Sequence, residues 1–169
     1  RAALDSVKLG TGFLFEKYDV ITGLPGVERV SAFETFIEHA DGLHMRPRSM
    51  FRSRIVAKET LKAQCPRFAT QIEMADGVTR TNQNELMLQG FGTSFALPDF
   101  VTVYEGWHLR PNAKGKGRHV LCISNATLLD ETYDHDSFPC AVFRYRERDV
   151  GFYGAGLIES FLPSQNRID

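Results

Sequence analysis

Basic side chains are the most concentrated chemistry-bearing residues in this sequence. The first cluster lies in HMRPRSMFRSR, and no acidic residue interrupts its members, Arg46, Arg48, Arg52 and Arg54. The second lies in FRYRER, where Arg144, Arg146 and Arg148 alternate with other residues and would share one face of a strand. Arginine offers paired donors to carboxylate or phosphate. Both clusters are therefore candidates for DNA contact or for ion pairs between subunits, and a solvated strand face is the simpler alternative.

A third basic segment is the loop from Pro111 to Gly117, which carries Lys114 and Lys116 between glycines. It joins two expected strands, so the two lysines would lie at the flexible tip of a hairpin. Contact with phosphate or with an acidic partner is one interpretation, and an ordinary solubilising loop is the other.

Catalytic and metal-binding motifs do not emerge from the sequence. Asp134-His135-Asp136 combines a histidine with two carboxylates, but it lacks a defined third ligand and a recognised spacing. Scattered carboxylates such as Glu105, Asp130 and Glu131 could pair with one another only in the fold. We therefore predict no catalytic residue, no metal site and no cofactor.

Composition sets the broad class. The chain has 169 residues, 43% of them hydrophobic, which is enough to bury a core, and a formal net charge of −1, which gives no global attraction to nucleic acid or membranes. No apolar run approaches the length of a membrane span. Three cysteines without metal-ligand spacing favour buried thiols in a reducing compartment. Because the chain begins at Arg1 and ends inside a helical pattern, we expect it to be a piece of a longer protein.

The N-terminal part predicts a helix followed by a hairpin. Arg1–Leu9 has helix-forming residues and Gly10 supplies a C-terminal stop. Phe13–Tyr18 and Val27–Val30 have strand character and are joined by a loop with glycine and proline. His39–Gly42 is expected to be a turn.

The middle of the chain predicts short helices against a sheet. Ala57–Gln64 and Phe68–Ala75 have helical patterns, and we expect them to cap a sheet. Phe100–Leu109 and His119–Ser124 alternate as strands of one hairpin. Between the second of these helices and the first strand, Asp76–Asp99 has weak patterning and is expected to be a long loop.

The C-terminal segment gives the clearest order of elements. A strand over Ala141–Arg148 leads through the glycines of GFYGAG into an amphipathic helix. The apolar residues of that helix lie near one face and should be buried against another surface; they are Leu157, Ile158, Phe161, Leu162 and Ile168. The fold class we predict is α+β, a β-rich mixed domain with short capping helices and a C-terminal helix.

Several phrases of the sequence resemble the portal, or head-to-tail connector, proteins of tailed bacteriophages and prophages. They are the helix-GTG-strand start at residues 10–12, the run RPRSMFR, the strand pair around YEGWHL with the turn NATLL, and the final FPCAVFRYRERDVGFYGAGLIESFLPSQ. The last phrase is the most specific, and in that family a similar phrase leads into a long helix.

The resemblance implies a structural subunit and not an enzyme. Residues 1–150 would form a β-rich, wing-type region and residues 151–169 the start of a stem-type helix. Portals form a homo-oligomeric ring, generally of twelve copies, at one capsid vertex of the virion, after assembly in the host cytoplasm. Double-stranded DNA passes through the ring, and terminase, scaffolding and head-completion proteins are the further partners; no membrane is involved.

Two other classes of function stay open. One is a stand-alone cytoplasmic α+β enzyme whose carboxylates and histidines meet in the fold, which a carboxylate or a histidine with a perturbed pKa in a deep pocket would support. The other is a non-specific nucleic-acid-binding module that uses the arginine clusters, which salt-sensitive DNA binding would support.

Overall fold

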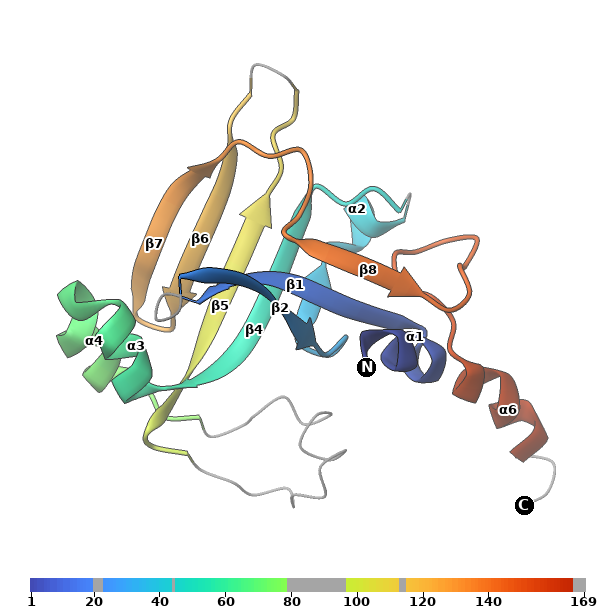
Figure 1. The fold of residues 1–169 in the computed structure, drawn as a ribbon, viewed down its shortest axis with the longest axis horizontal. Coiled ribbons are helices and arrows are strands. Elements are labelled where there is room, and N and C mark those ends of the chain that lie inside the picture. The colour runs from blue at the N-terminus through green and yellow to red at the C-terminus, as the bar shows by residue number, and fades with distance from the viewer. Residues whose placement is uncertain (20–22, 44, 79–96, 113–114, 166–169) are drawn as a thin grey trace. The chain divides into compact units, whose positions relative to one another are not determined.

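The computed structural model describes residues 1–19, 23–43, 45–78, 97–112 and 115–165 (Figure 1). Contacts divide the chain into two compact units. Unit 1 consists of Arg1–Arg48 and Ser137–Asp169, and unit 2 consists of Ser49–Asp136. In the sequence, unit 2 therefore lies between the two segments that form unit 1. The expected division at residue 150 concerns the role of the C-terminal helix in an assembly, and it stays a prediction.

The predicted α+β class is confirmed, with antiparallel sheets, short helices and a C-terminal helix. Unit 1 contains α1 (Ala2–Leu9), β1 (Thr11–Asp19), β2 (Leu24–Val30), β3 (Thr35–Ile37), α2 (His39–Gly42), β8 (Cys140–Arg144) and α6 (Leu157–Gln165). Unit 2 contains β4 (Ser49–Ala57), α3 (Lys58–Gln64), the 3-10 turn η1 (Pro66–Phe68), α4 (Ala69–Met74), β5 (Phe100–His108), β6 (Gly117–Ile123) and β7 (Ala126–Tyr133).

The centre of unit 1 is a three-stranded antiparallel sheet in the order β2-β1-β8. Alternation along β1 places Phe13 and Phe15 on one face, where both are buried. Phe13 lies opposite Val30 on β2 and stacks on Phe152, with ring centroids 6.3 Å apart. The aromatic pattern predicted for the first strand therefore builds the core of this unit.

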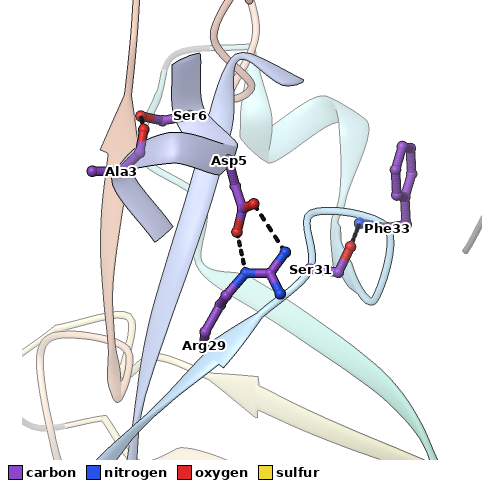
Figure 2. Close-up of polar contacts among 6 residues, drawn as sticks. All are labelled: Ala3, Asp5, Ser6, Arg29, Ser31 and Phe33. Carbon is purple, nitrogen blue, oxygen red and sulfur yellow. Dashed lines mark hydrogen bonds and ion pairs between the residues drawn. The ribbon is translucent and has the colours of Figure 1, made fainter. Parts of the chain in front are cut away.

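Helix α1 covers the other face of β1 and turns polar groups inward. Asp5 is buried and binds the guanidinium of Arg29 on β2 through both carboxylate oxygens (Figure 2). The Ser6 hydroxyl donates to the carbonyl of Ala3, 2.7 Å away. The bidentate ion pair fixes α1 to the sheet, because an arginine fork matches the two oxygens of a carboxylate.

Unit 2 is built on the antiparallel strands β4, β5, β6 and β7, which neighbour one another in that order. Its core combines Val101 and Val103 of β5 with Leu61 of α3 and Ile72 of α4. The expectation that the two helices cap a sheet is confirmed by this cluster. A bulge at Leu121/Cys122 shifts the register between β6 and β7.

Three expected elements differ from the structure. The last strand ends at Arg144 and not at Arg148, because the chain turns and only Arg146 pairs again, in an isolated bridge to Ala155. Residues of the NATLL turn belong to β7, whose exposed, polar pattern hid a strand that pairs along β6. His39–Gly42 is a short helix and not a turn. Most of the expected loop at 76–99 lies outside the described residues.

Within the described parts of the chain, no helix is both long enough and apolar enough to cross a membrane.

Candidate functional site

Two glycine-bearing turns of unit 1 meet at backbone contact, and we call this contact the glycine junction. It consists of Gly10-Thr11-Gly12 and Gly154-Ala155-Gly156. A Cβ atom added to Gly12 would lie 2.0 Å from the carbonyl oxygen of Ala2, and one added to Gly154 would lie 2.4 Å from that of Gly10. No side chain fits in either place, so glycine is required for this close approach.

Hydrogen bonds hold the junction together. The backbone N–H of Gly154 donates to the buried Thr11 hydroxyl over 2.8 Å, and the N–H of Tyr145 donates to the carbonyl of Gly10 over 3.2 Å. Gly10 itself has a φ of 91°, a left-handed conformation that favours glycine and that ends α1 as the sequence predicts. The junction therefore joins α1 and β1 to the segment that leads into α6.

Helix α6 leaves the junction with its apolar side chains exposed. Four of them form what we call the α6 stripe: Leu157, Ile158, Phe161 and Leu162, with exposed fractions of 37%, 54%, 61% and 53%. Figure 1 shows α6 at the end of the chain, beside α1 and beyond β8. The expectation that these residues are buried against another surface is not met within the described chain, and Ile168 lies outside the described residues.

The second arginine cluster is engaged within unit 1. Arg144 donates from Nε to the carbonyl of Phe152 over 2.7 Å, and its guanidinium lies 4.5 Å from the centre of that ring. Arg148 pairs with Glu159 of α6 at 2.5 Å. Arg146 is exposed. Because β8 ends at Arg144, the expected common strand face of these arginines does not form.

The first arginine cluster is also divided by the fold. Arg46 and Arg48 are exposed. Arg52 is buried and Arg54 is half-buried, and both lie on the same face of β4, whereas Phe51 on the opposite face is exposed. The solvated strand face predicted for Arg52 is therefore wrong: the arginine faces inward and the aromatic ring faces outward.

Of the two lysines predicted at the hairpin tip, the structure describes one. Lys114 lies outside the described residues, and Lys116 is exposed. Beside the tip, Arg110 binds Asp136 through two oxygens, one of them 2.6 Å from Nη2. This ion pair raises the pKa of Arg110 and lowers that of Asp136, chiefly through the hydrogen bond between them. Asp136 thus neutralises a cation at this end of unit 2.

A histidine between two carboxylates is the most chemically distinctive group of unit 2. His119 contacts Glu131 through Nδ1 at 2.8 Å and Glu105 through Nε2 at 3.1 Å. Trp107 stacks on the imidazole, with centroids 5.4 Å apart and planes 5° from parallel. Strand register produces this arrangement, because His119 lies opposite both Trp107 on β5 and Glu131 on β7. We call these four residues the His119 array.

The electrostatics of the His119 array favour the imidazolium. The hydrogen bond to Glu105 raises the pKa of His119 most, partial burial lowers it, and Glu131 raises it further, so the net pKa lies above the ordinary 6.5. A histidine whose two nitrogens both face carboxylates is held as a cation and does not act readily as a base. The arrangement fits a structural cross-strand ion pair, and it also fits a proton-holding group in a site.

The Asp134-His135-Asp136 segment does not form a metal site with the groups around it. His135 packs edge-on against Tyr133 with centroids 5.0 Å apart, and Asp136 is bound to Arg110. Among the residues whose placement is described, no group of three or more histidine, cysteine or acidic side chains could hold a metal ion.

Unit 1 contains a pocket of about 300 Å³ beside α2. Gly42 and Phe152 line its buried part, and Val150 and Tyr153 are exposed at its rim. The Tyr153 hydroxyl donates to the carbonyl of Thr35 over 2.7 Å, and burial raises the pKa of this phenol. Glu38 and Arg148 add one charge of each sign. The pocket is mainly apolar, so it suits an apolar side chain.

No protein-family model and no curated protein sequence matches this chain.

The sequence contained partial signals for these sites. Both glycine segments were predicted as turns from the sequence. Their contact was not predicted, because it joins residues as far apart as Thr11 and Gly154, which are separated by 143 positions, and a local pattern cannot indicate such a contact. His119 was visible only as a strand residue. Had β7 been recognised, pairing along the hairpin would have placed Glu131 opposite His119.

Proposed function

We propose that this chain is part of a portal protein of a tailed bacteriophage or prophage, a ring subunit through which DNA enters and leaves the capsid. The observation that carries the proposal is the glycine junction. Two of the phrases that resemble portals, the GTG turn and the GFYGAGL turn, are far apart in the sequence yet fit each other without room for a side chain. The junction therefore brings two separate parts of the resemblance into one contact.

Helix α6 supports the same proposal. It is anchored at its start by the glycine junction, and the α6 stripe is exposed to solvent. A stem-type helix that packs against other copies or other segments would need such a start, because an exposed apolar stripe is stabilised only when another surface covers it.

In this proposal the subunits form a ring, generally of twelve copies, at the capsid vertex of the virion, assembled in the host cytoplasm with scaffolding, terminase and head-completion proteins. The mass of the purified protein by light scattering tests the oligomeric part directly. We expect a discrete oligomer whose mass is a whole multiple of the subunit mass. A monomer at every concentration, also with a scaffolding partner present, would contradict the proposal.

The proposal also predicts how the protein treats DNA. Binding should be weak, independent of sequence and steeply reduced by salt, because a channel contacts phosphates and not bases. A titration that gave tight, sequence-specific binding would favour the nucleic-acid-binding module instead. Arg146 is the most suitable arginine to reverse in charge, because it is exposed, whereas Arg144 is engaged with Phe152. We expect Arg146→Glu to impair ring assembly, and an unchanged ring would count against a role in subunit contact.

A second candidate, an α+β enzyme, is favoured by one observation, the His119 array with its raised histidine pKa. A screen of metabolites by thermal shift would test it. For an enzyme we expect a compound that stabilises the native protein and does not stabilise His119→Gln, since glutamine cannot carry the charge. Equal shifts for both proteins would exclude a role of His119 in binding.

A further inference from the structure

The α6 stripe is an apolar surface that the described chain does not cover. Helix α1, which contacts α6, adds two more exposed leucines, Leu4 and Leu9. Clustered apolar side chains on neighbouring helices mark interaction surfaces more often than single exposed residues do. Phe161 is the most exposed of the stripe, and aromatic residues contribute most to the energetics of interfaces.

The pocket beside α2 is an apolar concavity in the same unit. Phe152 and Gly42 form its floor, and Val150, 62% exposed, stands at its rim. Its volume of about 300 Å³ can receive an aromatic side chain. The aromatic side chain of Phe161 therefore matches this pocket in size and in apolar character.

The stripe of one chain points away from the pocket of the same chain. Arg148 lines the pocket and pairs with Glu159, which fixes one side of α6 toward the pocket. At 3.6 residues per turn, Glu159 lies about 130° around the helix from the centre of the stripe. The stripe thus faces away from the side of α6 that pairs with the pocket residue Arg148, so the stripe and the pocket are two different surfaces, as a head-to-tail contact requires.

The charges beside the stripe and the pocket support a second copy of the chain as the occupant of the pocket. Lys8 is exposed beside the start of α6, where its carbonyl lies against Gly156. Glu38 is exposed at the pocket. Among the described contacts, neither side chain has an ion-pair partner. Arg148 at the pocket is already paired with Glu159 of its own chain. Glu38 would therefore pair with Lys8 of the next copy when the stripe of that copy enters the pocket.

We propose that copies of this chain associate head to tail, with Phe161 of the α6 stripe inserted into the pocket of the neighbouring copy and Lys8 facing that copy's Glu38. This inference rests on the proposed function, and it names the two surfaces that would join the subunits. A heterologous contact of this kind closes into a ring when its rotation permits and otherwise continues as a filament.

Two variants of the full chain separate the two surfaces. Phe161→Asp removes the aromatic side chain, and Val150→Asp places a charge at the rim of the pocket; both residues are exposed, so both proteins should fold. Ser160→Asp, on the opposite side of α6, is the matched control. By sedimentation velocity we expect self-association at least about tenfold weaker for each of the two variants and unchanged for the control.

Mixing the two variants gives the sharpest result. One has an intact pocket and the other an intact stripe, so the mixture should form heterodimers and stop there. Charge exchange gives a second test: Lys8→Glu and Glu38→Lys should each weaken association, and the double variant should restore it. If the Val150→Asp protein forms dimers alone, stripe-to-stripe packing replaces the proposal.

The outcomes distinguish this inference from the proposed function. Rings that persist in Phe161→Asp would overturn the inference and leave the portal proposal standing. Open filaments of the native protein that disappear in both variants would support the inference and contradict a portal. A native protein that stays monomeric at every concentration, also with a scaffolding partner present, would overturn both.

Discussion

Substitution of Gly12 by alanine should destabilise the protein strongly, because it forces a methyl group into the glycine junction. The added Cβ would lie 2.0 Å from the carbonyl oxygen of Ala2, whereas ordinary van der Waals contact begins at 3.4 Å. The obstacle is backbone and not a flexible side chain, so α1 must move away from β1. Overpacking typically costs 1–3 kcal/mol, and we expect about 3 kcal/mol here. For a chain of this length that corresponds to a Tm about 6–12 °C lower.

Gly26→Ala is the matched control for this experiment. Gly26 lies on β2 of the same sheet, has no positive φ, and its added Cβ would be 3.8 Å from the carbonyl of Lys17. We expect a change within about 0.5 kcal/mol for this variant. Thermal and urea unfolding, followed by circular dichroism, measure both. If Gly12→Ala were as stable as Gly26→Ala, the glycine junction would not have the tight contact on which the account depends.

Three further predictions concern single groups. Thr11→Val keeps the side-chain volume but leaves the buried N–H of Gly154 without its acceptor, so urea unfolding should show a loss of about 1–3 kcal/mol; a neutral result would mean that the hydrogen bond is absent. The pKa of His119 is raised in the folded state, so its stabilising contribution is fully present below the unfolded-state pKa of about 6.5 and is lost as the pH rises through the folded-state value. The stability difference between native protein and His119→Gln should therefore shrink as the pH rises above about 6.5, and a constant difference would refute the ion pairing. Burial raises the pKa of the Cys140 thiol to about 11, so Cys140 should react with iodoacetamide at neutral pH far more slowly in the folded protein than after denaturation; equal rates would show that the thiol is exposed.

Much of the fold could be predicted from local patterns. The Gly10 stop placed the end of α1, and the aromatic alternation from Phe13 placed β1. The strands around Phe100 and His119 and the helices that cap them were also expected, and the core of unit 2 confirms the capping. These elements have strong periodicity, because one face of each is buried. β7 lacked such a signal, since most of its residues are exposed and a bulge shifts its register with β6.

The candidate sites depend on contacts that a local pattern does not contain. A solvated strand face was the simpler interpretation for Arg52, because arginine usually lies at the surface, yet Arg52 is buried while Phe51 beside it is exposed. For Arg52, tertiary packing reversed the average preference of the residue. Arg144 was a candidate for contact with DNA or with another subunit, and the turn after β8 brings Phe152 onto its guanidinium. The glycine junction is different: its residues were recognised as turns, and only their meeting was missed.

The most direct test of the portal proposal is negative-stain imaging of the purified protein, alone and with a scaffolding partner. We expect closed rings with a central channel wide enough for duplex DNA, and fewer of them for Gly12→Ala, which disturbs the base of α6, than for Gly26→Ala. Uniform compact particles without a channel under both conditions would contradict it.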